Sequence, residues 1–100
     1  MYTVDPRRTD LAAAFKARPF GPHEIEVAAL VTALRLAPVA GKYVLLTAAD
    51  GGSWELAQLT GQRYEAPRRL GVHFTDLAAA EWAVFTRRWE ARTGVPLVLP

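Results

Sequence analysis

The side chains that could carry chemistry are few and stand far apart along the sequence. His23 and His73 are the two histidines, Ser53 is the single serine, and there is no cysteine. Histidines fifty residues apart, with no partner at helical spacing, lack the ligand pattern of a zinc site, so we expect no metal site in this chain. His73 is expected to be a surface residue of an edge strand. Ser53 follows two glycines rather than opening a helix, which indicates a turn residue rather than a nucleophile.

The acidic residues are dispersed, and Glu81 is the one with unusual neighbours. It is next to Trp82 in the stretch richest in aromatic residues, where partial burial could change its chemistry. The simpler interpretation is a carboxylate at the core boundary that pairs with an arginine. A stand-alone hydrolase centred on His23 and Glu81 is therefore one of three functional hypotheses.

Arginine clusters occur in the last third of the chain. The net charge is only +2, although the pI is about 9.4. Because phosphate binding needs a dense basic patch, these clusters make a small nucleic-acid-binding domain a second hypothesis. Solvated arginines that border an aromatic core are the simpler interpretation. The candidate nucleic-acid contacts are Arg68, Arg69, Arg87, Arg88 and Arg92.

A hairpin between Gly41 and Gly61 is the clearest structural signal. Asp50-Gly51 separates two runs of β-branched, aromatic and large apolar residues, a pattern that strongly favours a hairpin. The first run, residues 43–47, is apolar on both faces, which is typical of a central strand covered on both sides. A third strand, at the edge, is predicted near residues 70–74.

Helical patterns flank this hairpin on both sides. Asp5 or Thr9 could cap the first helix, Pro22 suits the first position of the second, and Thr75 could cap the third. Gly94 is placed to end the third helix. The sequence therefore predicts an α+β fold, a three-stranded antiparallel meander packed by two N-terminal helices and one C-terminal helix. The predicted segments of this single domain, residues 1–100, are a short helix at 1–18, a helix at 22–37, the meander at 42–74 and a helix at 75–93.

Apolar surface exceeds what three short helices and a small sheet are expected to hide. The second helix is apolar almost all round, and the chain has three tryptophans in 100 residues. Surplus apolar surface on a small protein indicates an interface, although complete burial within the monomer stays open. The candidate interface residues are Val27, Leu30, Val31, Leu34, Trp82, Phe85, Arg88 and Trp89.

The composition fits a globular protein, with 51% hydrophobic and 22% charged residues. The longest apolar run, residues 27–36, is interrupted by polar residues and is too short to cross a bilayer. No basic-then-apolar segment opens the chain, and no cysteine is available for a disulfide. We therefore expect a cytoplasmic protein without membrane contact.

Four local patterns give a further signal. They are Pro19-Phe-Gly-Pro-His23, Leu34-Arg35 with Pro38-Val-Ala-Gly-Lys-Tyr-Val-Leu45, Trp54-Glu-Leu-Ala-Gln-Leu-Thr-Gly61, and Ala80-Glu-Trp-Ala-Val-Phe85 with Arg88-Trp89 and Thr93-Gly94. Together they resemble the small subunit of N,N-dimethylformamidase over about residues 19 to 94. The resemblance rests on aromatic and glycine positions rather than on a catalytic motif.

This resemblance implies an amidohydrolase assembly in which a much larger chain holds an iron site built from tyrosine and glutamate ligands. The present chain would be a non-catalytic accessory subunit without a cofactor of its own. It would bind and stabilise the larger chain, or self-associate, through apolar surface. No catalytic residue carries over to a position here. The chain is short for that family before Asp5, so a homologue with a different partner also stays open.

Overall fold

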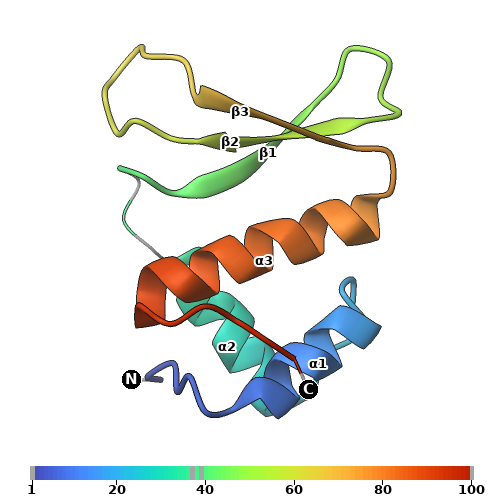
Figure 1. Ribbon diagram of the computed structural model, residues 1–100, viewed down its shortest axis with the longest axis vertical. Coiled ribbons are helices and arrows are strands. Elements are labelled where there is room, and N and C mark those ends of the chain that lie inside the picture. The colour runs from blue at the N-terminus through green and yellow to red at the C-terminus, as the bar shows by residue number, and fades with distance from the viewer. Residues whose placement is uncertain (1, 37, 39, 100) are drawn as a thin grey trace. The chain divides into compact units, whose positions relative to one another are not determined.

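The computed structural model describes residues 2–36, 38 and 40–99, and these residues form three helices and one three-stranded sheet (Figure 1). The predicted α+β class and the antiparallel three-stranded sheet are confirmed. In chain order the elements are α1 (Thr9–Ala17), α2 (Ile25–Arg35), β1 (Tyr43–Thr47), β2 (Trp54–Gln58), β3 (Arg68–Phe74) and α3 (Leu77–Thr93).

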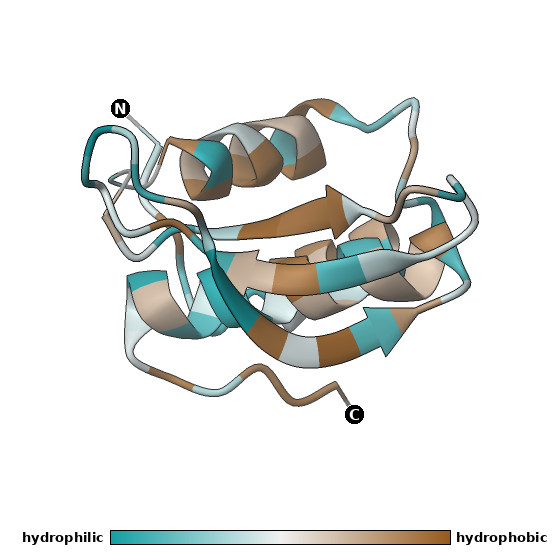
Figure 2. Ribbon diagram, turned by 90° about the horizontal axis from the view of Figure 1, so that it is seen from above, coloured by the Kyte–Doolittle hydropathy of each residue, from teal (hydrophilic) through white to brown (hydrophobic). Residues whose placement is uncertain are grey.

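The sheet has the order β1-β2-β3, so β2 is the central strand and the prediction of a central β1 was wrong. Short connections place consecutive strands side by side, and β3 therefore pairs with the free side of β2. Leu45 of β1 lies opposite Leu56 of β2, in antiparallel register. Leu56 and Ala57 are buried, whereas β1 is only half-buried. Along β2 and β3, hydrophobic residues are interleaved with hydrophilic ones, whereas β1 carries an unbroken hydrophobic run (Figure 2).

The turns of the sheet follow the glycine and aspartate signals in the sequence. At the predicted hairpin tip, Gly51 adopts a φ of 70° and its N–H donates to the carbonyl of Ala48. The Asp50 carboxylate accepts a hydrogen bond from the N–H of Gly52 at 2.9 Å. A left-handed φ is a conformation that glycine adopts at little cost, which explains why the chain reverses here.

The third strand is longer than predicted and contains a bulge. It begins at Arg68, directly after Pro67, so the proline precedes the ladder and removes no strand hydrogen bond. Arg69 lies opposite Ala57, but the next paired position is His73 opposite Glu55. Residues 70–72 of β3 therefore stand against a single residue of β2. Gly71, with a φ of 74°, allows this irregularity.

The helix ends differ in part from the capping predictions. α1 begins at Thr9 with Arg8 before it, because Asp5 accepts a hydrogen bond from the N–H of Arg7 instead of capping the helix. α2 begins at Ile25 rather than at Pro22, since the intervening residue Glu24 is extended. The cap of α1 and the start of α2 were therefore predicted wrongly.

Capping of α3 was wrong at one end and right at the other. The carboxylate of Asp76 accepts a hydrogen bond from the N–H of Ala78 at 3.2 Å, so Asp76 rather than Thr75 caps this helix. Gly94 ends it as predicted, with a φ of 74° and an N–H that donates to the carbonyl of Glu90 at 2.8 Å.

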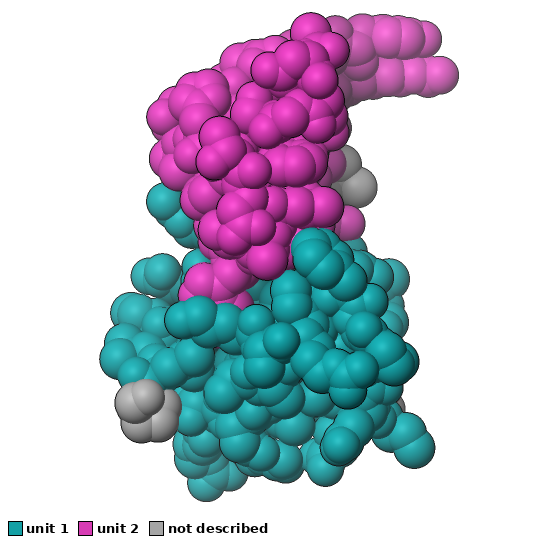
Figure 3. Space-filling view, turned by 90° about the vertical axis from the view of Figure 1, so that its right-hand side faces the viewer, with its two compact units in different colours: residues 1–37, 85–100 teal, residues 38–84 magenta. Residues whose placement is uncertain are grey.

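The chain divides into two compact units (Figure 3). Unit 1 comprises residues 1–37 and 85–100, and unit 2 comprises residues 38–84. Helix α3 is continuous and supplies residues to both units.

Unit 1 has an aromatic core. Phe15 of α1 stacks on Phe85 of α3 with 4.3 Å between ring centroids, and Phe85 is followed by Trp89 at 6.1 Å. Trp89 and Leu30 are each 1% exposed. Burial of such a side chain stabilises the fold by about 1.5–3 kcal/mol, so these few residues hold the helices of unit 1 together.

Unit 2 consists of the sheet and the first half of α3, which runs along one face of the sheet (Figure 1). Its buried apolar residues are Leu56, Ala57, Ala80 and Val84. Alanine at two of these positions keeps this core small. Among the described residues, no helix is both long enough and apolar enough to span a bilayer.

Candidate functional site

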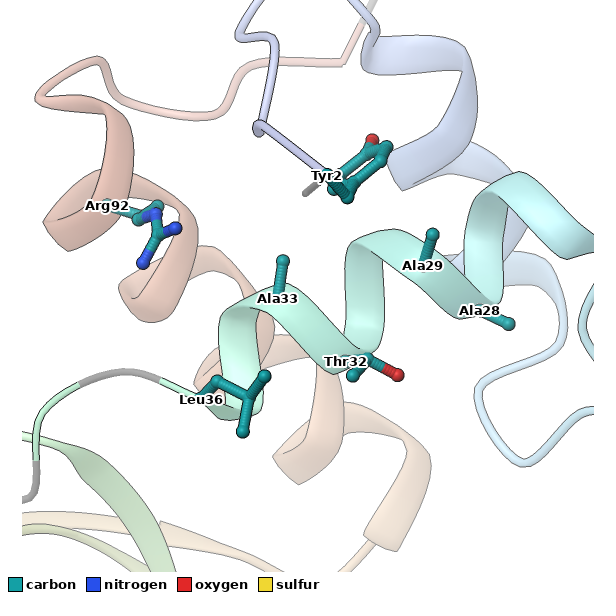
Figure 4. Close-up of a pocket in the computed structure, with 7 residues that line it drawn as sticks. All are labelled: Tyr2, Ala28, Ala29, Thr32, Ala33, Leu36 and Arg92. Carbon is teal, nitrogen blue, oxygen red and sulfur yellow. The ribbon is translucent and has the colours of Figure 1, made fainter.

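An apolar groove of about 590 Å³ runs along the solvent side of α2 in unit 1 (Figure 4). Ala29 and Ala33 point toward the side on which Tyr2 and Arg92 lie, whereas Thr32 points to the other side. Small side chains along one helix face leave the space that forms this groove. The full lining is Tyr2, Ala28, Ala29, Thr32, Ala33, Leu36 and Arg92.

Large apolar side chains stand at both ends of α2 beside this groove. Ile25, at the first position of the helix, is 89% exposed, and Leu36, directly after its last residue, is 76% exposed. A single exposed apolar residue is ordinary, but two that bracket an apolar groove mark a surface suited to another protein.

Charged groups lie at the two ends of the same surface. At the N-terminal end of α2, Glu26 accepts a hydrogen bond from Arg8 at 3.0 Å, and Arg8 also pairs with Asp10. At the other end, Arg92 of α3 lines the groove beside Ala33. This side of α2 therefore has Glu26, paired with Arg8, near its N-terminal end and Arg92 near the other end.

Tyr2 forms part of the groove wall and is half-buried. Burial raises the pKa of its hydroxyl above the ordinary tyrosine value, while the charge of Arg8 acts in the opposite direction. The hydroxyl therefore stays protonated at neutral pH and can donate a hydrogen bond.

A polar cluster on unit 2 is built around Glu55 of β2. Its side chain is only 11% exposed, and Oε1 accepts a hydrogen bond from Nη1 of Arg69 at 2.6 Å. Oε2 accepts a bond from the N–H of Gly71 at 3.3 Å, and Nε2 of His73 lies 3.8 Å away. A hollow of about 250 Å³ adjoins this cluster and is lined by Ser53, Glu55, Arg69 and His73, among others.

This cluster is better suited to fixing the β3 bulge than to catalysis. The hydrogen bond from Arg69, helped by the charge of His73, holds the pKa of Glu55 below its usual value although burial opposes this shift. An ionised carboxylate with both oxygens occupied is a weak base. The 3.8 Å between His73 and Glu55 is too long for a hydrogen bond, so no serine–histidine–acid relay is assembled. His73 is exposed on an edge strand, as predicted.

The two residues of the hydrolase hypothesis have separate surroundings. Nε2 of His23 lies 3.0 Å from the carbonyl oxygen of Arg18, so it carries the proton and donates that bond. Its ring lies beside Phe15, with 5.7 Å between centroids. These contacts hold the α1–α2 connector against α1 within unit 1. Glu81 is half-buried and belongs to unit 2. The hydrolase hypothesis stays a prediction that no contact of His23 supports.

Most of the predicted interface residues are enclosed by the chain itself. Trp82 and Arg88 are half-buried, and both have interaction partners within the chain. The exposed neighbours on α2 therefore offer more contact surface than the predicted residues do. The enclosed residues are Val27, Leu30, Val31, Leu34, Phe85 and Trp89, each at most 8% exposed.

The predicted arginine contacts also divide between the two units. Arg68 and Arg69 belong to β3 in unit 2, and the charge of Arg69 is offset by Glu55. The other three belong to the part of α3 in unit 1, where Arg87 and Arg88 have partners of their own. The nucleic-acid hypothesis stays a prediction.

Metal ligands do not converge in the part of the chain that the structure describes. No three histidine, cysteine, aspartate or glutamate side chains in residues 2–36, 38 and 40–99 are close enough to hold an ion.

Sequence reasoning missed the groove and the Glu55 cluster for different reasons. The groove depends on Tyr2, which lies in the predicted 1–18 segment but precedes α1 in the structure, and on Arg92, which comes from a helix distant in the sequence. The Glu55 cluster depends on the bulge, which sets the register of β3. A signal was available for α2 only, since Ile25 and Leu36 lie opposite the stripe of Val27, Leu30, Val31 and Leu34 and make the helix apolar almost all round.

These features define a small α+β chain whose described surface offers an apolar groove and a carboxylate that is already hydrogen-bonded within the chain. A family model described as N,N-dimethylformamidase alpha subunit matches residues 4–95. The chain therefore belongs to the N,N-dimethylformamidase alpha subunit family, and the resemblance read from its sequence is confirmed. A search of curated proteins gave no match.

Proposed function

We propose that this chain is a non-catalytic small subunit that binds and stabilises the larger, metal-dependent chain of an N,N-dimethylformamidase. The single observation that carries the proposal is the family match over residues 4–95. An alpha subunit of a named enzyme is one part of an assembly, so a companion chain is the natural partner.

Two physical observations support this role. Ile25 and Leu36 expose large apolar side chains, which is typical of a chain that works in an assembly rather than alone. The described residues bring no three histidine, cysteine, aspartate or glutamate side chains together, and the family resemblance places the iron of such an enzyme in the larger chain. The lack of cysteines is compatible with assembly in the cytoplasm.

Trp82 and Arg88 remain the proposed contacts among the residues selected from the sequence. Both are half-buried, so part of each side chain is accessible. Tryptophan and arginine are also the residue types most often found to dominate binding energy at interfaces.

The test is co-expression of this chain with a tagged N,N-dimethylformamidase large subunit from the same genome. The two chains should purify together and hydrolyse N,N-dimethylformamide, whereas this chain alone should release no dimethylamine. Trp82→Ala and Arg88→Glu should each weaken the complex about tenfold or more. Arg87→Glu, on the neighbouring exposed position, is the matched control and should leave binding unchanged. A large subunit that purifies alone and is equally active and stable would overturn the proposal.

A further inference from the structure

The exposed face of α2 carries a self-complementary apolar stripe. Ile25, Ala29, Thr32 and Leu36 follow one another at steps of four, three and four, which places them on one line along the helix. The two large members stand at the ends, and the two small ones stand in the middle. The stripe therefore has the same profile when read in either direction.

We propose that this stripe is the contact surface between two copies of the chain, with their α2 helices antiparallel about a two-fold axis. In such a pair, with the axis opposite the midpoint of the stripe, Ile25 of one copy faces Leu36 of the other. Ala29 faces Thr32 in the same way. The small central residues let the two helices approach closely, and each large end residue enters the groove of the other copy.

Charge complementarity selects a second copy as the occupant. Glu26 and Ala33, seven residues apart, lie on the same flank of α2, and Arg92 lines the groove on that flank (Figure 4). In an antiparallel pair related by a two-fold axis, the same flank of α2 lies on the same side of the pair in both copies, so the two flanks are neighbours. Glu26 of each copy therefore lies against the Arg92 end of the other, and the two-fold axis produces this acidic–basic pair twice.

The size of the surface sets the expected strength. An 11-residue helix is about 16 Å long, so the contact lies at or below the ~1,200 Å² of the smaller stable interfaces. We therefore expect a reversible dimer that forms at micromolar concentrations or above. This pairing goes beyond binding to a larger chain and does not rest on it.

A pair of charge reversals tests the register. Glu26→Arg and Arg92→Glu should each convert both ion pairs into like-charge contacts and weaken self-association about tenfold at low salt. An equimolar mixture of the two variants restores opposite charges at both contacts, so it should form a mixed dimer about as tightly as the wild type. Sedimentation equilibrium over a range of about 5 to 500 µM measures the dissociation constants of the wild type, the two variants and their mixture.

Two further variants keep this test independent of folding. Glu24→Arg reverses a charge at the same end of α2 but outside the contact, and it should leave the dissociation constant unchanged. Leu36→Asp changes a residue that is 76% exposed, so it should abolish the dimer while circular dichroism stays that of the wild type.

Several results would overturn the proposal. They are a wild type that stays monomeric throughout the concentration range, an assembly larger than a dimer, and a mixture of the two reversals that fails to restore pairing. If the same reversals instead release the large subunit from a chain that does not self-associate, the groove receives that subunit and the second copy is the wrong occupant.

Discussion

Glu55 shows how the surroundings of one residue limit its chemistry. Its carboxylate is nearly enclosed and accepts hydrogen bonds from Arg69 and from the N–H of Gly71. Both interactions favour the ionised form, and they outweigh the effect of burial, so the pKa of Glu55 lies below its usual value. A group in this state holds a strand in register more readily than it exchanges a proton.

The lowered pKa predicts a pH dependence of stability. Because the folded-state pKa is below the ordinary glutamate value of about 4.3, Glu55 stabilises the fold above that value. This contribution disappears as the pH falls through the lower folded-state pKa. Glu55→Gln should therefore be less stable than the wild type at pH 7, and the difference should shrink at pH 3. Urea unfolding midpoints at both pH values measure it, and an equal difference at the two values would refute the assignment.

The residue scale is also where the sequence was least informative. Ser53 and the two histidines could be identified as isolated groups, and the expectation of an exposed His73 on an edge strand is confirmed. The proximity of Glu55, Arg69 and His73 could not be foreseen, because a bulge shifts the register of β3 by a distance that no propensity specifies.

At the scale of elements, turn chemistry is the link between sequence and structure. The hairpin at Asp50-Gly51 followed from a strong local signal, because only a few residue types tolerate a left-handed φ. The helix starts were less predictable, since several capping residues compete within a few positions. Asp5 and Asp76 illustrate this, because the first forms a local pair with Arg7 and the second takes the cap assigned to Thr75.

Gly61 provides a test of this link. It has a φ of 79°, and an added Cβ would lie 2.7 Å from Cβ and 2.8 Å from Cα of Ala40, so the backbone would have to shift. Gly51 has a φ of 70° with no atom within 4 Å of an added Cβ, so it is the matched control. Gly51→Ala should cost about 1 kcal/mol, and Gly61→Ala about 2 kcal/mol or more. Urea unfolding of both variants decides this, and equal losses would contradict the packing at Ala40.

At the scale of the whole molecule, the chain has two compact units but one continuous helix that belongs to both. We propose that the chain is a single cooperative domain, because a helix is most stable when both of its halves are ordered. The amount of apolar residue in the sequence pointed to surplus surface. It could not show that Phe85 and Trp89 of α3 are buried inside unit 1 and that α2 keeps an exposed stripe, because both depend on tertiary packing.

Phe15→Ala tests this cooperativity. Phe15 is 3% exposed and stacks on Phe85, so its truncation should cost about 3–5 kcal/mol of unfolding free energy. If the units unfold together, hydrogen exchange should accelerate in the strands of unit 2 as well as in α1. Phe20→Ala, at a side chain that is 63% exposed, is the control and should change stability by less than about 0.5 kcal/mol. Unchanged protection of β2 would show that the two units unfold separately.

Native mass spectrometry of the chain co-purified with an N,N-dimethylformamidase large subunit tests the central claim most directly. The predicted result is a complex that contains both chains and loses the small chain only on activation or denaturation. Separate peaks for the two chains at micromolar concentration, together with full amidohydrolase activity in the large chain alone, would contradict a role as its subunit.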